Sequence, residues 1–295
     1  MQLFSPPPLE RATPLFGTLV RIRVEACSHD HAIEASSKAI AAMARVHRLM
    51  SFHDPESELS DLNRSAHRKP IRVSEETAAV VAEAINFARL SHGVFDPTVA
   101  PAATCAGTLP RPDGAPAPSP RANWKDVEVD RESMTVRFRR ALWLDLGGIA
   151  KGYAVDLAAG ILRHESIPQA CVNAGGDLRV FGPAAETVAL DPGPGASKAA
   201  RAARILNGSL ASSGSAGPIG DQRALAVHFD AKRRRLAPRR FVTVLAKRCL
   251  VADALTKVVL ARGCAAGRLL EQLGASAAIC SPALRWSTCG ARSAD

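Results

Sequence analysis

The segment Leu144–Asp156, which reads LDLGGIAKGYAVD, carries the strongest chemical signal in the sequence. An apolar run meets Asp145, a glycine turn with a lysine follows, and a helical pattern then begins. A glycine turn at a helix start presents backbone N–H groups that favour an anion such as phosphate. Lys151 would add a movable positive charge, and Asp145 would accept hydrogen bonds from a ligand hydroxyl or ring N–H. The spacing matches neither Walker A nor GxGxxG, so an anion site and a tight turn with a solvated lysine are both open.

A second glycine turn lies at residues 173–177, where the sequence reads NAGGD. Gly175 and Gly176 would let the backbone adopt a positive φ or approach a ligand closely. The plain alternative is a β-turn that contains an Asx-type residue. Further on, ASSGSAGP at 211–218 offers small hydroxyl groups in a bend. Taken alone, neither segment identifies a ligand.

Two later segments carry groups suited to catalysis. VADALTK at 251–257 places Asp253, Thr256 and Lys257 on one face of a helix's first turn. There Asp253 is either a helix cap or a ligand of a hard cation. VHFD places His228 on the same side of a strand as the aspartate two residues later, although a lone histidine is more often structural.

The composition is that of a globular protein with a strong positive charge. The chain has 295 residues, of which 47% are hydrophobic and 22% charged, and its formal net charge is +10. This charge raises nucleic acid or another polyanion as a partner, and KRRRLAPRR at 232–240 concentrates basic residues. Binding of single-stranded nucleic acid requires aromatic side chains on which bases stack, and none accompany that stretch. No helix-turn-helix or zinc-finger spacing occurs either. We therefore expect no specific nucleic-acid partner.

The seven cysteines are scattered, and none forms a CxxC pair. A structural zinc site is therefore not expected, and reduced thiols in apolar runs favour a reducing compartment. The N-terminus has no charged start followed by an apolar run of signal-peptide length. No apolar stretch reaches the length of a membrane span, so we expect a cytoplasmic protein without one.

Hydrophobic periodicity predicts the elements that must position these residues. Alternation at 18–24 predicts a half-buried strand, and helical spacing predicts helices over 31–50 and after an N-cap at Ser74. Further strands are expected at 126–130, 134–146, 169–174, 178–182, 224–230 and 241–247, and further helices from 150 to about 163 and from about 252. We expect 1–14 to be a flexible proline-rich tail and 15–295 to be one α+β domain, with 105–123 as a loop insertion.

Seven motifs in this order resemble the ApbE family of flavin transferases, whose members are FAD:protein FMN transferases. The resemblance covers residues 16–274 and is carried by LFGTLVRI, SFHDPESELSDLN, GVFDPTVAP, LWLDLGGIAKGYAVD, CVNAGGDLRVFG, NGSLASSG and VADALTK. It implies a single ApbE-like, T-fold-related α+β domain with a mixed or antiparallel sheet flanked by helices. It also implies a Mg²⁺-dependent reaction that transfers FMN from FAD to a threonine hydroxyl of an acceptor flavoprotein through a phosphoester bond and releases AMP.

The resemblance implies a Mg²⁺ site made by a backbone carbonyl of the glycine turn, an aspartate, and a threonine four residues later. By position the first two are Gly148 and Asp253, the latter also expected to be catalytic, whereas Lys257 stands where the threonine is expected. An ammonium group does not ligate Mg²⁺ and is repelled by it. Three outcomes are open: Thr256 ligates the metal, Lys257 replaces its charge, or metal affinity is reduced. We expect a retained metal, because Mg²⁺ keeps waters in its shell and tolerates the loss of one protein ligand.

The resemblance also implies the residues that bind the flavin nucleotide. These are Phe16, Val94, Phe95, Asp96, Asp145, Lys151, Gly175, Gly176, Ser213 and Gly214. Phe16 stands where the family has a methionine and would still pack on an isoalloxazine ring. His228 is the candidate for orienting or deprotonating the acceptor threonine, although HFDA departs from the family's HIxDP pattern.

Two other functions stay open. In one, the departures at Lys257, Ser215 and HFDA have removed transferase activity, which leaves a flavin-binding paralogue. In the other, the chain binds a polyanion through residues 232–240. AMP release from FAD separates the first from a transferase, and a steep fall in nucleic-acid affinity with salt would support the second.

Overall fold

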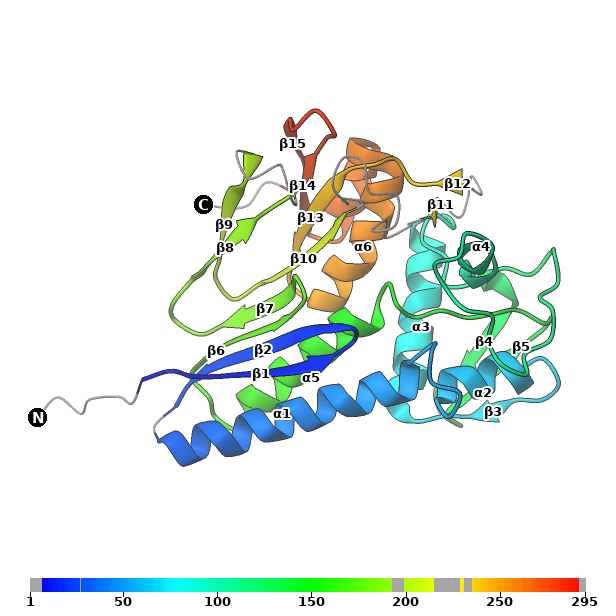
Figure 1. Cartoon of the computed structure of the whole chain (residues 1–295), viewed down its shortest axis with the longest axis horizontal. Coiled ribbons are helices and arrows are strands. Elements are labelled where there is room, and N and C mark those ends of the chain that lie inside the picture. The colour runs from blue at the N-terminus through cyan, green and yellow to red at the C-terminus, as the bar shows by residue number, and fades with distance from the viewer. Residues whose placement is uncertain (1–6, 27, 193–198, 215–228, 231–234, 292–295) are drawn as a thin grey trace, which may run out of the picture.

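A computed structural model describes residues 7–26, 28–192, 199–214, 229–230 and 235–291. Its centre is an eight-stranded sheet in the order β1-β2-β6-β7-β10-β13-β14-β15 (Figure 1). Every neighbouring pair in this sheet is antiparallel. The strands are β1 (Leu9–Leu15), β2 (Thr18–Glu25), β6 (Gln169–Ala174), β7 (Asp177–Phe181), β10 (Ser209–Gly214), β13 (Phe241–Ala246), β14 (Ser276–Cys280) and β15 (Trp286–Gly290).

Three long helices cover one face of this sheet. Helix α1 (His29–Met50) packs on β1 and β2, α5 (Ala150–His164) on β6 and β7, and α6 (Cys249–Arg262) on β10 and β13 (Figure 1). Strand β2 shows why this face is buried: Val20, Ile22 and Val24 point into the core, while the arginines between them point outward. The other face, over β7 and β10, is covered by the hairpin of β8 (Glu186–Leu190) and β9 (Arg201–Ile205), which forms a second, smaller core.

A smaller layer lies beside the main sheet. It contains α2 (Glu58–Ser65), α3 (Glu75–Leu90), α4 (Ala100–Cys105) and the three-stranded sheet β3-β5-β4 (Figure 1). The strands of that sheet are β3 (Ile71–Arg72), β4 (Val127–Asp130) and β5 (Thr135–Phe138), and the remaining elements are η1 (Trp124–Asp126), β11 (Phe229–Asp230), β12 (Arg235–Leu236), η4 (Gly263–Ala266) and α7 (Gly267–Gln272). The fold is therefore α+β with an antiparallel sheet flanked by helices, as the sequence predicts. Within the described part of the chain, none of the helices combines the length and apolarity that crossing a bilayer demands.

Local signals placed several elements correctly. Ser74 is the N-cap of α3, since its Oγ accepts the Thr77 N–H at 3.3 Å. The alternating segment at 18–24 is β2, and the helix expected over 31–50 is α1. The strand expected over 134–146 is shorter, because β5 ends at Phe138 and the chain then runs without regular structure to the glycine turn.

The expectation of a flexible tail over residues 1–14 is wrong for residues 9–14. They form most of β1, which pairs along its length with β2. Prolines mislead here because β1 is an edge strand, where Pro14 can face solvent without breaking a ladder on its outer side. The segment 106–123, within the expected loop insertion, has no helix or strand.

Candidate functional site

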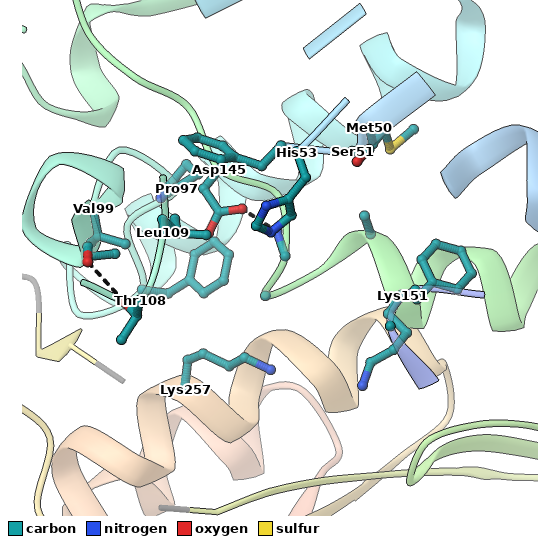
Figure 2. A pocket seen from close by; sticks show the side chains of 18 of the residues that line it. Met50, Ser51, His53, Pro97, Val99, Thr108, Leu109, Asp145, Lys151 and Lys257 are labelled. Carbon is teal, nitrogen blue, oxygen red and sulfur yellow. Dashed lines mark hydrogen bonds between the residues drawn. The ribbon is translucent and has the colours of Figure 1, made fainter. Parts of the chain in front are cut away.

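A cavity of about 530 Å³ opens where six segments of the chain meet. Its wall comes from the turn between β1 and β2, the end of α1 with the loop after it, residues 94–99, residues 103–109 at the end of α4, the glycine turn before α5, and α6. Six titratable side chains line it: His47, His53, Asp96, Asp145, Lys151 and Lys257. In Figure 2, Lys151 from α5 and Lys257 from α6 lie on one side, while Asp145 and His53 lie on the other and point toward one another. The volume suits a small-molecule ligand.

Aromatic side chains form the apolar part of the wall. Phe16 occupies the two-residue turn between β1 and β2 with φ +55°, and Gly17 follows with φ +68°. The Phe16 ring packs edge-on against His47 with centroids 5.0 Å apart. Val94 and Phe95 are buried and also line the cavity. This wall can pack on a planar ring.

The glycine turn before α5 is shaped by close approach. Asp145 Oδ1 accepts the Gly147 N–H at 2.9 Å. A Cβ built on Gly148 would lie 3.3 Å from both Lys257 Cε and Phe95 Cε2, so Gly148 leaves the space through which Lys257 reaches the cavity. The turn therefore joins a buried strand-like run to a helix while keeping the lysine stem in place.

Two carboxyl groups in the wall have raised pKa values. Burial raises the pKa of Asp145, although the Gly147 N–H and the charges of His53 and Lys257 lower it in part. Burial also raises the pKa of Asp96, whose Oδ1 accepts the Thr98 N–H at 2.8 Å and the Thr98 hydroxyl at 2.7 Å. The Asp145 N–H donates to the Pro97 carbonyl at 2.8 Å, which ties the two segments together.

Asp253 is fully buried, and both of its carboxylate oxygens have partners. Oδ2 accepts the Gly152 N–H at 3.1 Å, and Oδ1 lies 2.5 Å from Lys257 Nζ. Contact between α5 and α6 makes this possible, because a Cβ on Gly152 would lie 2.6 Å from the Cys249 carbonyl oxygen and 2.8 Å from Asp253 Cβ. Asp253 thus binds the first turn of α5 and one lysine ammonium.

Thr256 is fully buried and does not line the cavity. Its hydroxyl donates to the Asp253 carbonyl at 2.7 Å and lies 2.9 Å from Ser213 Oγ. Ser213 Oγ in turn accepts from Lys257 Nζ at 3.3 Å. Ser213 therefore lies behind Lys257, at the end of β10.

The donors expected for Mg²⁺ do not fit that metal in this structure. Both oxygens of Asp253 and the hydroxyl of Thr256 are engaged within the protein, and the Lys257 stem packs against Gly148. An ammonium group thus lies where the resemblance implies a dication.

A second buried carboxylate pairs with the other lysine. Asp177 is 1% exposed, and its Oδ2 lies 3.1 Å from Lys151 Nζ, an ion contact without hydrogen-bond geometry. Burial and the nearby Asp253 charge raise the pKa of Asp177 to about 7, although both lysines oppose this shift. Burial lowers the pKa of Lys151, but Asp177 and Asp253 outweigh that effect and raise it. Lys151 therefore stays cationic, and Asp177 is the member of the pair that titrates.

The glycines expected to bind flavin lie outside the cavity lining. Gly175 and Gly176 form the β6–β7 turn with φ +63° and +97°, and Gly176 donates its N–H to Asn173 Oδ1 at 3.0 Å. This is the Asx-type turn that was the plain alternative, and neither glycine lines the cavity. Gly214 ends β10 opposite Phe241, also outside the lining. His228 and residues 232–234 of the basic stretch lie outside the described residues.

Asp156, the last residue of LDLGGIAKGYAVD, has a structural task that the sequence analysis missed. Its carboxylate accepts the N–H groups of Cys249 and Leu250 at 2.9 and 3.0 Å, in the first turn of α6, and pairs with Arg179. Helix α6 has no side-chain cap of its own. The available signal was an aspartate that ends the motif on the same helix as Lys151. His53, in the wall opposite the lysines, was also missed.

Comparison with known proteins agrees with this geometry. The sequence profile of the ApbE family matches residues 16–280. The chain belongs to the ApbE family. Among solved structures, the ApbE protein of Thermotoga maritima superposes with a TM-score of 0.80 and 25% identity, covering 96% of this chain and 97% of that one. The apo flavinyl transferase ApbE of Pseudomonas stutzeri gives a TM-score of 0.81 over 99% and 97% of the two chains; at 19% identity this shows the ApbE fold alone.

Curated relatives of this ApbE chain carry one name. The FAD:protein FMN transferase of Vibrio cholerae is 33% identical over 148 residues, which is 48% of this chain and 44% of that protein. The FAD:protein FMN transferase of Haemophilus influenzae is 32% identical over 154 residues, with the same two shares. The matched segments thus span less than half the length of these relatives.

Proposed function

We propose that this chain transfers FMN from FAD to a threonine hydroxyl of an acceptor flavoprotein through a phosphoester bond, with release of AMP. One observation carries the proposal: an aromatic wall and two lysine ammonium groups face the same cavity at the glycine turn. FAD offers a planar ring and a pyrophosphate, which are the matching parts. Membership of the ApbE family and the name shared by the curated relatives support this assignment.

The cavity residues divide between the two parts of FAD. Phe16 and Phe95 pack on the isoalloxazine ring, where aromatic contacts favour offset or edge arrangements. Asp145 accepts a hydrogen bond from a ring N–H or a ribityl hydroxyl. Lys151 and Lys257 form charge-assisted hydrogen bonds with the pyrophosphate. Asp253 acts on the substrate through Lys257, which it holds.

The reaction is a displacement at phosphorus. The threonine oxygen forms a bond to the phosphorus on the riboflavin side, the bond from that phosphorus to the bridging oxygen breaks, and AMP leaves with the bridging oxygen and its electron pair. The two lysines stabilise the negative charge that develops there. The threonine proton passes to a base, for which His228 is the proposed group. Since the residues present do not fit Mg²⁺, no step is assigned to a metal.

A direct assay tests this proposal. Purified protein is incubated with FAD and a candidate acceptor, with and without Mg²⁺. We expect the acceptor to gain the mass of an FMN phosphoester on a threonine, and AMP to appear in equal amount by chromatography. Tight FAD binding with neither product would contradict the transferase and favour a flavin-binding paralogue. If the protein does not bind FAD but binds an RNA or DNA probe with an affinity that falls steeply as salt rises, a polyanion-binding protein would be favoured.

A further inference from the structure

Lys257 is held as a fixed cation at the edge of the cavity. Its Nζ lies 2.5 Å from Asp253 Oδ1 and 3.3 Å from Ser213 Oγ, and its side chain keeps 19% of its surface exposed. The chain leaves room for the lysine stem by having glycine at position 148. Lys257 therefore combines a buried anchor with an accessible charge.

The charge balance around Asp253 is complete without a metal. A fully buried carboxylate needs a countercharge and hydrogen bonds. Lys257 supplies the first at Oδ1, and the Gly152 N–H supplies a hydrogen bond at Oδ2. A dication at the same carboxylate would have to displace one ammonium and would lie close to the second, Lys151, on the same side of the cavity (Figure 2). Charges of like sign at such a distance repel strongly where water is scarce.

Lys257 also has donor capacity for a ligand. A lysine ammonium carries three N–H donors. Within the described residues, Asp253 and Ser213 take two of them. One donor is left for an oxygen of a phosphate group in the cavity.

We propose that Lys257 takes the place of the divalent cation, so that FAD binds this chain through the Lys257 ammonium and needs no metal. This inference rests on the proposed function, because it names the group that meets the pyrophosphate of FAD. It is also a departure from what the resemblance implies for this position. The carboxylate of Asp253 is then the anchor of a lysine and not a metal ligand.

Wild-type protein gives the first test. The dissociation constant of FAD is measured by quenching of flavin fluorescence in EDTA and in excess Mg²⁺. We expect the two dissociation constants to agree within about twofold, because the cation that binds FAD is the ammonium group of Lys257, which EDTA does not remove. A loss of affinity of about tenfold or more in EDTA would overturn the inference.

Three variants make the test specific. Lys257→Met removes the charge and keeps the stem, and we expect it to weaken FAD binding about tenfold or more in both buffers. Because this variant leaves Asp253 without a countercharge, Asp253→Asn combined with Lys257→Met is measured as well and should show the same loss. Lys38→Met is the matched control, since Lys38 pairs with Glu34 four residues earlier on α1, and with Glu165, and does not line the cavity. FAD affinity equal to wild type in both Lys257 variants would overturn the inference.

Metal binding is measured separately by electron paramagnetic resonance of Mn²⁺, without FAD. We expect no bound Mn²⁺ in wild type and bound Mn²⁺ in Lys257→Thr, which frees Asp253 Oδ1 and adds a hydroxyl on the same helix face. Stoichiometric Mn²⁺ in wild type, or none in either protein, would contradict the exclusion of metal by Lys257.

The product assay distinguishes the failure of this inference from the failure of the proposed function. If FAD binds without metal but no AMP is released, the role of Lys257 is supported and the transferase activity is contradicted. If AMP is released only with Mg²⁺, the transferase activity is supported and the role of Lys257 is contradicted.

Discussion

Asp156 and Asp253 cap each other's helices. Asp253 on α6 accepts the Gly152 N–H in the first turn of α5, and Asp156 on α5 accepts the N–H groups of Cys249 and Leu250 in the first turn of α6. Neither helix has a side-chain cap of its own. The two helices that carry the cavity lysines are thus fixed to one another at both starts.

Removal of the Asp156 carboxylate should loosen the start of α6. We expect Asp156→Ala to lower the free energy of unfolding by about 1–3 kcal/mol, because two helix N–H groups lose their acceptor and Arg179 loses its partner. Asp156→Asn keeps one acceptor oxygen and should cost less. Urea unfolding of both variants is the measurement, and equal losses would argue against capping as the main role.

Gly152 should tolerate no side chain. Gly152→Ala places a Cβ 2.6 Å from the Cys249 carbonyl oxygen, so we expect a loss of about 1–3 kcal/mol in unfolding free energy from overpacking. Gly160 on the same helix is the control, because it is exposed and a Cβ there has nothing within 4 Å. Gly160→Ala should stabilise by up to ~1 kcal/mol through helix propensity. Similar effects from the two substitutions would refute close packing at Gly152.

Asp177 should make stability depend on pH. Its pKa is raised to about 7, mainly by burial, against ~3.9 in an unfolded chain. Between these values the folded state holds a proton that the unfolded state lacks, so the contribution of Asp177 is complete below about pH 4 and is lost as pH rises through about 7. We subtract the unfolding free energy of Asp177→Asn from that of wild type, and we expect this difference to decrease as the pH rises from 5 to 8.

The measurement is urea unfolding of both proteins at several pH values in that range. Asp130→Asn is the control whose difference from wild type should stay constant over this range, because hydrogen bonds from Ser133 and the Glu132 N–H lower the pKa of that exposed carboxyl and it is ionised in both folded and unfolded states above pH 5. A difference for Asp177→Asn that stays constant with pH would mean that Asp177 does not titrate there.

Lys151 should contribute to FAD affinity through its charge. We expect Lys151→Met to raise the dissociation constant of FAD about tenfold or more, because one charge-assisted hydrogen bond to the pyrophosphate is lost. Lys125→Met is the control, since Lys125 is exposed, lies over the Trp124 ring and does not line the cavity. Fluorescence titration measures both. An unchanged dissociation constant of FAD for Lys151→Met would show that Lys151 does not contribute to FAD binding.

Local chemistry made part of this site predictable from the sequence. A glycine turn between an apolar run and a helix predicted the place of Asp145 and Lys151, and both line the cavity. The partners of Asp253 were harder, because Thr256 and Lys257 are adjacent on the helix and only packing decides between them. Thr256 turns to the carbonyl of its own helix, while Lys257 reaches the carboxylate.

Long-range pairs account for what the sequence could not predict. Asp156 and the start of α6 are more than 90 residues apart, and nothing near Cys249 indicates that its cap comes from another helix. The sequence did not indicate strand β1, because the prolines at 6–8 and Pro14 are typical of a tail, whereas pairing with β2 sets the conformation of this segment. Caps and periodicity within one element were thus predictable from the sequence, whereas partners supplied by the tertiary fold were not.

The turn that carries Phe16 has a consequence for how the protein is made. Phe16 in the β1–β2 turn is translated long before Lys257 of α6, yet both side chains line the cavity. A nascent polypeptide that still lacks α6 has the other lining segments but neither Lys257 nor the carboxylate that holds it. A ligand can therefore meet the complete cavity only after α6 has been synthesised.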